Sequence, residues 1–165
     1  MSREVIQHPF PPVVDSRSRI LILGSFPSVR SRADGFYYAH PQNRFWRMLS
    51  LILDAPLPES TEEKKCLLLA HGLALWDSAA SVSIEGSMDA SVRNATPVAI
   101  EEVLSVAPIA QIVCNGALAG KLYHRYLEPV TGLSAHILPS TSPANASWSL
   151  EKLVSAWAPY LILHP

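Results

Sequence analysis

RILILGSFPSVRSRADGFYYAHPQNRFWRMLSLIL, residues 19–53, decides the fold. The apolar run from Arg19 to Leu23 predicts a strand buried on both faces of a parallel sheet, ending at Gly24. After an irregular loop we expect a helix that begins at Pro41, because a proline at the first helical position loses no hydrogen bond. Apolar residues then recur at helical spacing: Phe45, Trp46, Met48, Leu49, Ile52 and Leu53. Ligands bind beyond the carboxyl ends of strands in open α/β sheets, so residues 24–43 should line a site.

The rest of the chain alternates strand and helix patterns. Further strands are predicted at residues 73–76, 109–114 and 134–138. Helices are predicted at residues 60–71, from Thr96 and Pro97 to Pro108, from 117 to about 127, and from about 150 onward. Ser60 and Glu63 are expected to form a capping box at the start of the first of these. Residues 1–18 and 78–95 are expected to be irregular. This alternation predicts one α/β domain over residues 1–165, with a four-stranded parallel sheet between helices in a three-layer α/β/α sandwich.

Composition narrows the class of protein. Of the 165 residues 48% are hydrophobic and 16% charged, which suits a domain with a large core. No apolar run approaches the roughly 20 residues that span a membrane. The first residues, MSREVIQHPFPP, lack the apolar centre of a signal peptide, so we expect a cytoplasmic protein without membrane association. Cys66 and Cys114 lack metal-ligand spacing and are interpreted as reduced core residues. A monomer is the default expectation.

Charge points to a local patch on a neutral protein. The formal net charge is −1, which argues against coating of nucleic acid by bulk electrostatics. Four arginines nevertheless crowd the opening stretch: Arg30, Arg32, Arg44 and Arg47. A polyanion could dock there, and a solvated arginine cluster without a ligand explains the pattern equally well.

Four polar segments follow the predicted strands and should meet at one edge of the sheet. They read GSFPS, WDSAA, CNGA and LPSTSPAN. The hydroxyls of PSTSPAN, next to a helix start, suit phosphate, although a capped turn is the plainer interpretation. Phe26, Phe36, Tyr37 and Tyr38 could stack on a base or close a pocket. Asp77 must find a donor, either a base N–H or, more plainly, a backbone N–H or Arg93.

Familiar catalytic motifs are missing from the sequence. It has no GxSxG, no Walker motif, no dinucleotide fingerprint and no zinc-like spacing of His and Cys. Of the six histidines, His40 alone falls in the expected site. An enzyme of this sequence would therefore need little acid–base help, no metal and no cofactor.

The motifs described so far resemble the uracil-DNA glycosylase superfamily over nearly the whole chain. The resemblance rests on GSFPS at residues 24–28, YYAHPQNRFW at 37–46, and LPSTSPAN with SLEKLV within 138–154. The second block looks much like that of the mismatch-specific uracil glycosylases. The resemblance implies a four-stranded parallel sheet between helices, DNA containing a deaminated base as the partner, and removal of that base in base excision repair.

Two departures from the family pattern favour one branch. Most members place Asp or Asn where Phe26 stands, to hold the attacking water, and His or Asn where Leu138 stands, to stabilise the departing base. Both positions are apolar here. This is similar to the hypoxanthine-DNA (deoxyinosine) glycosylase branch, in which the asparagine of the second block serves catalysis. The resemblance therefore implies Asn43 as the catalytic residue.

The remaining expected contacts follow from that resemblance and from the strand ends. Base-binding residues are expected to be Ser25, Phe26, Tyr38, Asp77 and Asn115. DNA-binding residues are expected to be Ser28, Arg30, Arg44, Ser140, Thr141, Ser142 and Asn145. Ala144, Asn145 and the loop 83–93 are candidates for the side chain that fills the gap left by a flipped nucleotide. A mismatch uracil or thymine glycosylase and a non-catalytic nucleic-acid-binding relative remain alternatives.

Overall fold

A parallel four-stranded sheet lies at the centre of the computed structural model, which describes residues 4–27, 29–84 and 93–162. The strands are β2 (Ile20–Gly24), β3 (Leu73–Asp77), β6 (Gln111–Asn115) and β7 (Ala135–Leu138), in the order β3-β2-β6-β7. Every residue of β2 and β3 is buried, as expected for strands covered on both faces. The prediction of a parallel sheet with buried strands is confirmed.

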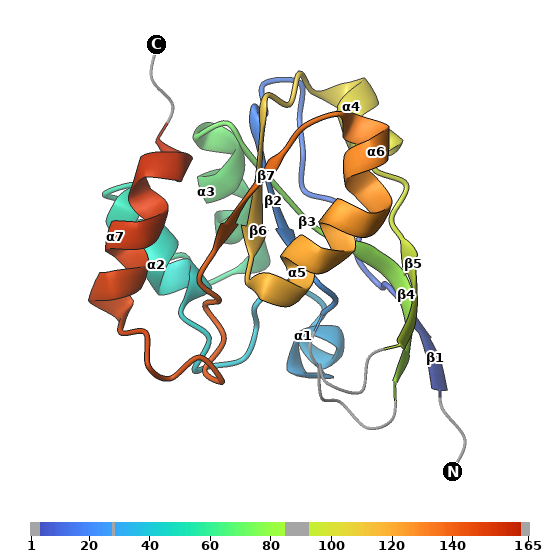
Figure 1. Cartoon of the computed structure of the whole chain (residues 1–165). Helices are drawn as coiled ribbons and strands as arrows, with labels where there is room; N and C mark the ends of the chain where they lie inside the picture. The colour runs from blue at the N-terminus through green and yellow to red at the C-terminus, as the bar shows by residue number, and fades with distance from the viewer. Residues whose placement is uncertain (1–3, 28, 85–92, 163–165) are drawn as a thin grey trace.

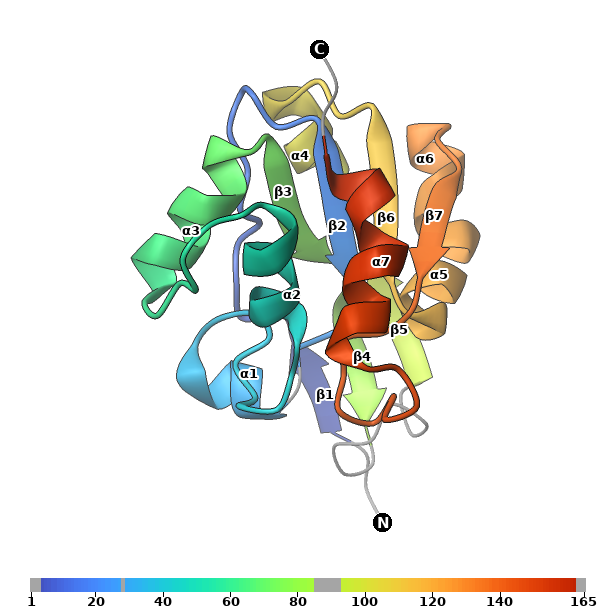
Figure 2. The same ribbon diagram turned by 90° about the vertical axis from the view of Figure 1, so that its left-hand side faces the viewer.

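Helices cover both faces of this sheet and complete the three-layer sandwich (Figure 1). Those on one face are α2 (Phe45–Ile52), α3 (Thr61–Ala70) and α7 (Leu150–Leu161), and α2 and α7 lie side by side (Figure 2). Those on the other are α4 (Glu101–Val106), α5 (Ala117–Leu122) and α6 (Glu128–Thr131), with the π-helical turn η2 (Tyr123–Leu127) joining the last two. Phe45 and Trp157 pack edge to face at 6.2 Å between ring centroids, which fastens α2 to α7.

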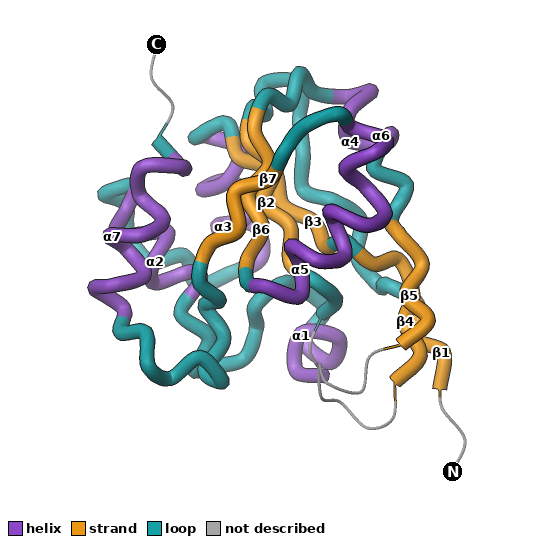
Figure 3. Tube along the Cα trace, viewed as in Figure 1, coloured by secondary structure: helices purple, strands orange, loops and turns teal. Residues whose placement is uncertain are grey.

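The expectation that residues 1–18 and 78–95 are irregular is wrong for residues 4–7, 79–84 and 93–95, which form strands. A second, antiparallel sheet of order β1-β4-β5 forms from β1 (Glu4–Gln7), β4 (Ala79–Ile84) and β5 (Arg93–Pro97), apart from the main sheet (Figure 3). The strand β4 carries an alternation of apolar Ala80, Val82 and Ile84 with polar Ser81 and Ser83, but this signal covers only five residues and was missed. Its pairing with β5 also shifts register twice.

Two helix starts were placed too early in the sequence. Pro97 ends β5 and α4 begins at Glu101, because the Thr96 hydroxyl bonds to Ser81 instead of capping a helix. Pro41 lies in a turn and α2 begins at Phe45, whose N–H donates to the side chain of Asn43. The segment between Gly24 and Asn43 also contains a short helix, α1 (Val29–Asp34), that no sequence pattern indicated.

The two cysteines differ in environment. Cys114 is buried in β6, and burial raises the pKa of its thiol to about 12, so it stays protonated and inert. Cys66 is exposed on α3, which corrects its interpretation as a core residue. The helix turns Leu67 and Leu68 toward the sheet instead.

The N-cap of α3 provides a test of the local sequence signals. Ser60 accepts a hydrogen bond from Glu63 N at 3.0 Å, which is the N-cap half of the predicted capping box, while the Glu63 carboxylate accepts from Glu59 N at 3.2 Å. Replacing Ser60 with alanine should lower the free energy of unfolding by about 1 kcal/mol, measured by urea denaturation. Ser155→Ala, on the exposed side of α7, is the matched control and should change it by less than about 0.5 kcal/mol. Equal effects of the two substitutions would contradict the capping role.

Candidate active site

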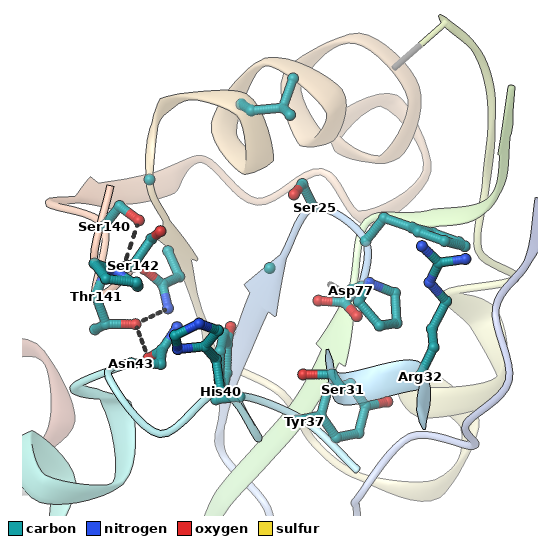
Figure 4. A pocket seen from close by; sticks show the side chains of 18 of the residues that line it. Ser25, Ser31, Arg32, Tyr37, His40, Asn43, Asp77, Ser140, Thr141 and Ser142 are labelled. Atoms are coloured by element: carbon teal, nitrogen blue, oxygen red, sulfur yellow. Dashed lines mark hydrogen bonds between the residues drawn. The ribbon is translucent and has the colours of Figure 1, made fainter. Parts of the chain in front are cut away.

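A cavity of about 280 Å³ with both polar and apolar walls opens where the four parallel strands end (Figure 4). Its walls come from the segments after β2, β3, β6 and β7 and from the loop between α1 and α2. The volume lies just below the range of about 300 to 1,000 Å³ usual for small-molecule sites. Four segments distant in sequence therefore meet around a space of the size of one small ring system.

Most of the expected site residues line this cavity. They are Ser25, Phe26, Tyr38, Asn43, Asp77, Asn115, Ser140, Thr141 and Ser142, and His40 joins them. Arg44 and Asn145 do not line it. Ser28, the side chain of Arg30 and the loop 85–92 lie outside the described residues. The structure shows proximity, and the roles of these side chains remain predictions.

Asn43 is held by hydrogen bonds that fix the orientation of its amide. Its Oδ1 accepts from Phe45 N at 2.9 Å and from the Thr141 hydroxyl at 2.9 Å. A backbone N–H can only donate, so Oδ1 must be the atom that faces it. The side-chain hydrogen bonds of Asn43 to described residues both use Oδ1, so its Nδ2 N–H groups are available to the cavity that Asn43 lines.

Asn115 holds Thr141 in place from the neighbouring strand. Its Oδ1 accepts from Thr141 N at 3.0 Å and its Nδ2 donates to the Thr141 hydroxyl at 3.0 Å. Thr141 is fully buried, and its hydroxyl donates a hydrogen bond to Asn43 Oδ1 (Figure 4). A continuous chain of hydrogen bonds thus runs from the end of β6 to Asn43. Asn115, expected to bind a base, has both ends of its side-chain amide engaged in this chain.

Asp77 ends β3 inside the cavity and is 3% exposed. Its Oδ2 lies 2.8 Å from Nε2 of His8, which is neither of the plainer partners expected from sequence. The other oxygen, Oδ1, lies over Gly24: a Cβ there would stand 2.3 Å from it. His8 was missed because it precedes residues 19–53 and lies in a segment that was expected to be irregular. The one available signal was a carboxylate that needed a donor.

Tyr38 places a buried hydroxyl beside that carboxylate. The backbone of Tyr38 has φ +54°, a conformation that costs a side-chain-bearing residue about 1 to 3 kcal/mol. One face of its ring stacks on Phe45 at 4.3 Å between centroids. The hydroxyl oxygen has no hydrogen-bond partner among the described residues and would stand 2.9 Å from a Cβ at Gly24. Burial, and then the charge of Asp77, raises the pKa of this hydroxyl, so it is a proton donor at neutral pH.

The other three aromatic side chains of the loop differ in position. Phe36 is buried and stacks on Trp46, so it belongs to the core and not to the cavity. Tyr37 lines the cavity, but its hydroxyl donates to the carbonyl of Pro11 at 3.0 Å. Phe26 is half-buried at the cavity wall, with the Arg32 guanidinium 5.9 Å from its ring centroid. An aromatic wall and one cation therefore border the space.

Arg44 engages the loop after β7 and not the open surface. Its guanidinium donates to the carbonyls of Ser142 at 2.9 Å, Asn145 at 3.1 Å and Trp148. Asn145 adds a bond from its side-chain nitrogen to Ser140 O at 3.0 Å. Both residues, expected to bind DNA, use their donors to shape the loop that carries Thr141.

No three side chains of His, Cys, Asp or Glu in the described ranges gather closely enough to hold a metal ion. Among the helices of those ranges, none has the length and apolar character needed to cross a membrane.

The comparison with known sequences identifies the family. Residues 11–161 match the model of the Uracil DNA glycosylase superfamily. The chain belongs to the uracil-DNA glycosylase superfamily. Two relatives, from Methanosarcina acetivorans and Methanosarcina barkeri, are both named hypoxanthine DNA glycosylase. They are 35% and 34% identical over 150 and 151 residues, which cover 90% of this chain and 94% of each relative.

A solved structure supports the same assignment. A solution NMR structure of a candidate uracil DNA glycosylase from Methanosarcina acetivorans matches with a TM-score of 0.81 at 30% identity. The match covers 96% of this chain and 97% of that one. The resemblance to the uracil-DNA glycosylase superfamily and its fold is confirmed.

Arg44 provides a test of how this glycosylase-family site is assembled. Arg44→Ala should lower the free energy of unfolding by about 1.5 to 3 kcal/mol, because it removes charge-assisted bonds to loop carbonyls. Arg47→Ala, which removes an exposed arginine three residues later, should change it by less than about 0.5 kcal/mol. Urea denaturation measures both. If the two variants were equally stable, the hydrogen bonds from Arg44 to the loop carbonyls would not contribute to the stability of the fold.

Proposed function

We propose that this protein is a monofunctional DNA glycosylase that flips a deaminated base, hypoxanthine, into the cavity and hydrolyses its bond to the sugar. One observation carries the proposal: an oriented amide, Asn43, and one oxygen of a buried carboxylate, Asp77, serve the same base-sized space. The names of the two Methanosarcina relatives support it. An abasic site in DNA would be the product.

Recognition of the base rests on complementary donors and acceptors. Hypoxanthine presents N1–H as a donor beside O6 as an acceptor. Asp77 Oδ1 would accept from N1–H, and the Tyr38 hydroxyl or a backbone N–H near Ser25 would donate to O6. Adenine presents an acceptor at N1, which would face the carboxylate and repel it. The arrangement therefore favours the deaminated base over its normal precursor.

Hydrolysis requires a water positioned at the sugar rather than a strong base. The N-glycosidic bond can break through an oxocarbenium-like sugar whose positive charge the DNA phosphates favour. Asn43 has no titrating group, and both lone pairs of its Oδ1 are already used by Phe45 and Thr141. Its Nδ2 would hold the water by donating to it. Asn115 and Thr141 then act through Asn43 by fixing its orientation.

Contacts to the DNA backbone would come from the loop after β7. Ser140 and Ser142 line the cavity beside Thr141 and offer hydroxyls and backbone groups to a phosphate. Flipping a nucleotide costs a few kcal/mol, which stacking against Phe26 and these contacts would offset. Ser28 and Arg30 remain expected phosphate contacts. Asn145 and Arg44 would contribute indirectly, through the shape of the loop.

Substitution of Asn43 tests the proposed role of its amide. Asn43→Ala should slow single-turnover release of hypoxanthine from an inosine-containing duplex by about 10²- to 10³-fold. Asn43→Asp should also be slow, because it keeps the acceptor and loses the N–H donor. Gln42→Ala, an exposed neighbour, should retain the wild-type rate. Full activity of Asn43→Ala would show that another residue positions the water.

Substitution of Asp77 tests base recognition. Asp77→Asn should slow the same reaction roughly 10- to 100-fold, since an amide donor would then oppose N1–H. Asp54→Asn, at an exposed acid after α2, serves as the control and should react like wild type. An unchanged rate in Asp77→Asn would remove this residue from the recognition scheme.

Uracil is the second candidate substrate. It also presents an N–H beside a carbonyl oxygen, and the family name and the solved neighbour both refer to uracil. Single-turnover rates on inosine, uracil, xanthosine and thymine-mismatch duplexes, scored by abasic-site formation, would rank the substrates. Release of any of these bases would exclude a non-catalytic nucleic-acid-binding protein.

A further inference from the structure

His8 lies behind the wall of the cavity and contacts the carboxylate that serves it. Its side chain is 5% exposed, and its Nε2 lies 2.8 Å from Asp77 Oδ2. The backbone of His8 is anchored by a bond from its N–H to Ala80 O at 2.7 Å, which continues the pairing of β1 with β4. The second sheet therefore holds this side chain against the end of β3.

The proton on the His8 ring is placed by a second hydrogen bond. Phe10 N donates to His8 Nδ1 at 3.1 Å, so Nδ1 is an acceptor and carries no proton. In the neutral ring the proton must then lie on Nε2 and point to Asp77 Oδ2. His8 is thus a donor of fixed direction, and Asp77 Oδ2 is the acceptor. One carboxylate oxygen is used, and only Oδ1 remains for a ligand.

We infer that His8 is a positioning residue for base recognition: it binds Oδ2 of Asp77 and thereby presents Oδ1 over Gly24 as a single acceptor for one base N–H. The inference rests on the proposed function and extends it to a residue outside the matched family region, which begins at residue 11. A single acceptor matches the one N–H on the edge of hypoxanthine. Without His8 the carboxylate would lose its buried donor and the fixed direction of Oδ1.

Packing alone would also keep His8 in place. Its ring makes edge contacts with Phe10 at 5.4 Å and Phe26 at 5.7 Å between centroids, and a tilted contact with Tyr37 at 5.9 Å. Phenylalanine at position 8 would preserve this aromatic cluster and remove the donor. Glutamine would preserve a donor near the place of Nε2 and remove the ring. These two variants separate positioning from packing.

The first measurement is single-turnover base release from an inosine-containing duplex. His8→Phe should be slower than wild type by about 10- to 100-fold, the usual consequence of losing a hydrogen bond to a buried charge. His8→Gln should lie closer to wild type than His8→Phe does. His71→Phe, a half-buried histidine that bonds Leu67 O within α3, is the control and should keep the wild-type rate.

The second measurement tests whether removing His8 raises the rate of base release, instead of lowering it, when Asp77 is replaced by asparagine. In Asp77→Asn the His8 N–H should bind the amide oxygen and turn the NH₂ group toward the cavity, donor against donor. Removing His8 lets this amide rotate and present its oxygen. The double variant His8→Phe with Asp77→Asn should therefore release hypoxanthine severalfold faster than Asp77→Asn alone.

The outcomes separate the inference from the proposed function. A structural role for His8 would lower the rate in both backgrounds, so a double variant no faster than Asp77→Asn overturns the inference even if His8→Phe is less stable. An active wild type with an equally active His8→Phe overturns it as well. A wild type that releases none of the bases in the duplex panel overturns the proposed function, and the inference with it.

Discussion

The parallel register of β3, β2, β6 and β7 is the constraint on which the site depends. Gly24 pairs with Asp77 across one side of the sheet, and Asn115 pairs with Leu138 across the other. Because all four strands point the same way, the segments after them begin at one edge. A shift of a single strand by one residue would turn its side chains to the opposite face and separate the polar groups.

Hydrogen bonds then convert this edge into a defined cavity. Asn115, at the end of β6, clamps Thr141, and Thr141 orients Asn43 on the far side of the loop. Arg44 binds the carbonyls of the loop after β7 and keeps Thr141 in reach. Because each of these polar groups has a partner in place, the amide of Asn43 is oriented before any ligand arrives. Such preorganisation suits a reaction that needs a positioned water and little proton transfer.

The small antiparallel sheet extends the site from an unexpected direction. Its strand β4 follows Asp77 by two residues, and its strand β1 delivers His8 to the same carboxylate. Val13 bridges to Leu75 between these contacts and ties the N-terminal segment to the edge strand β3. Residues 8–13 are therefore part of the architecture around the cavity.

Local signals in the sequence determined much of the protein. Apolar runs ending in Gly24, Asp77 and Asn115 were sufficient to predict the parallel sheet. Ser60 and Glu63 were sufficient to predict the start of α3. Both features could be predicted because strand burial and helix capping depend on residues only a few positions apart. The cavity residues after each strand followed from the sheet geometry, and the family from three motifs. The small sheet was missed because the apolar alternation of β4 spans only residues 80–84, which is a weak signal on its own.

Only the tertiary structure decided which polar groups pair. His8 and Asp77 are 69 residues apart, and Asn43 and Thr141 are 98 apart. No local pattern records a hydrogen bond between segments so distant, since each partner satisfies the other only after the chain has folded. For the same reason the sequence alone did not reveal that Arg44 binds carbonyls of the loop after β7. The sequence by itself specified the parallel sheet and the edge at which the candidate site lies. Long-range packing determined which side chains form hydrogen bonds with one another at that edge.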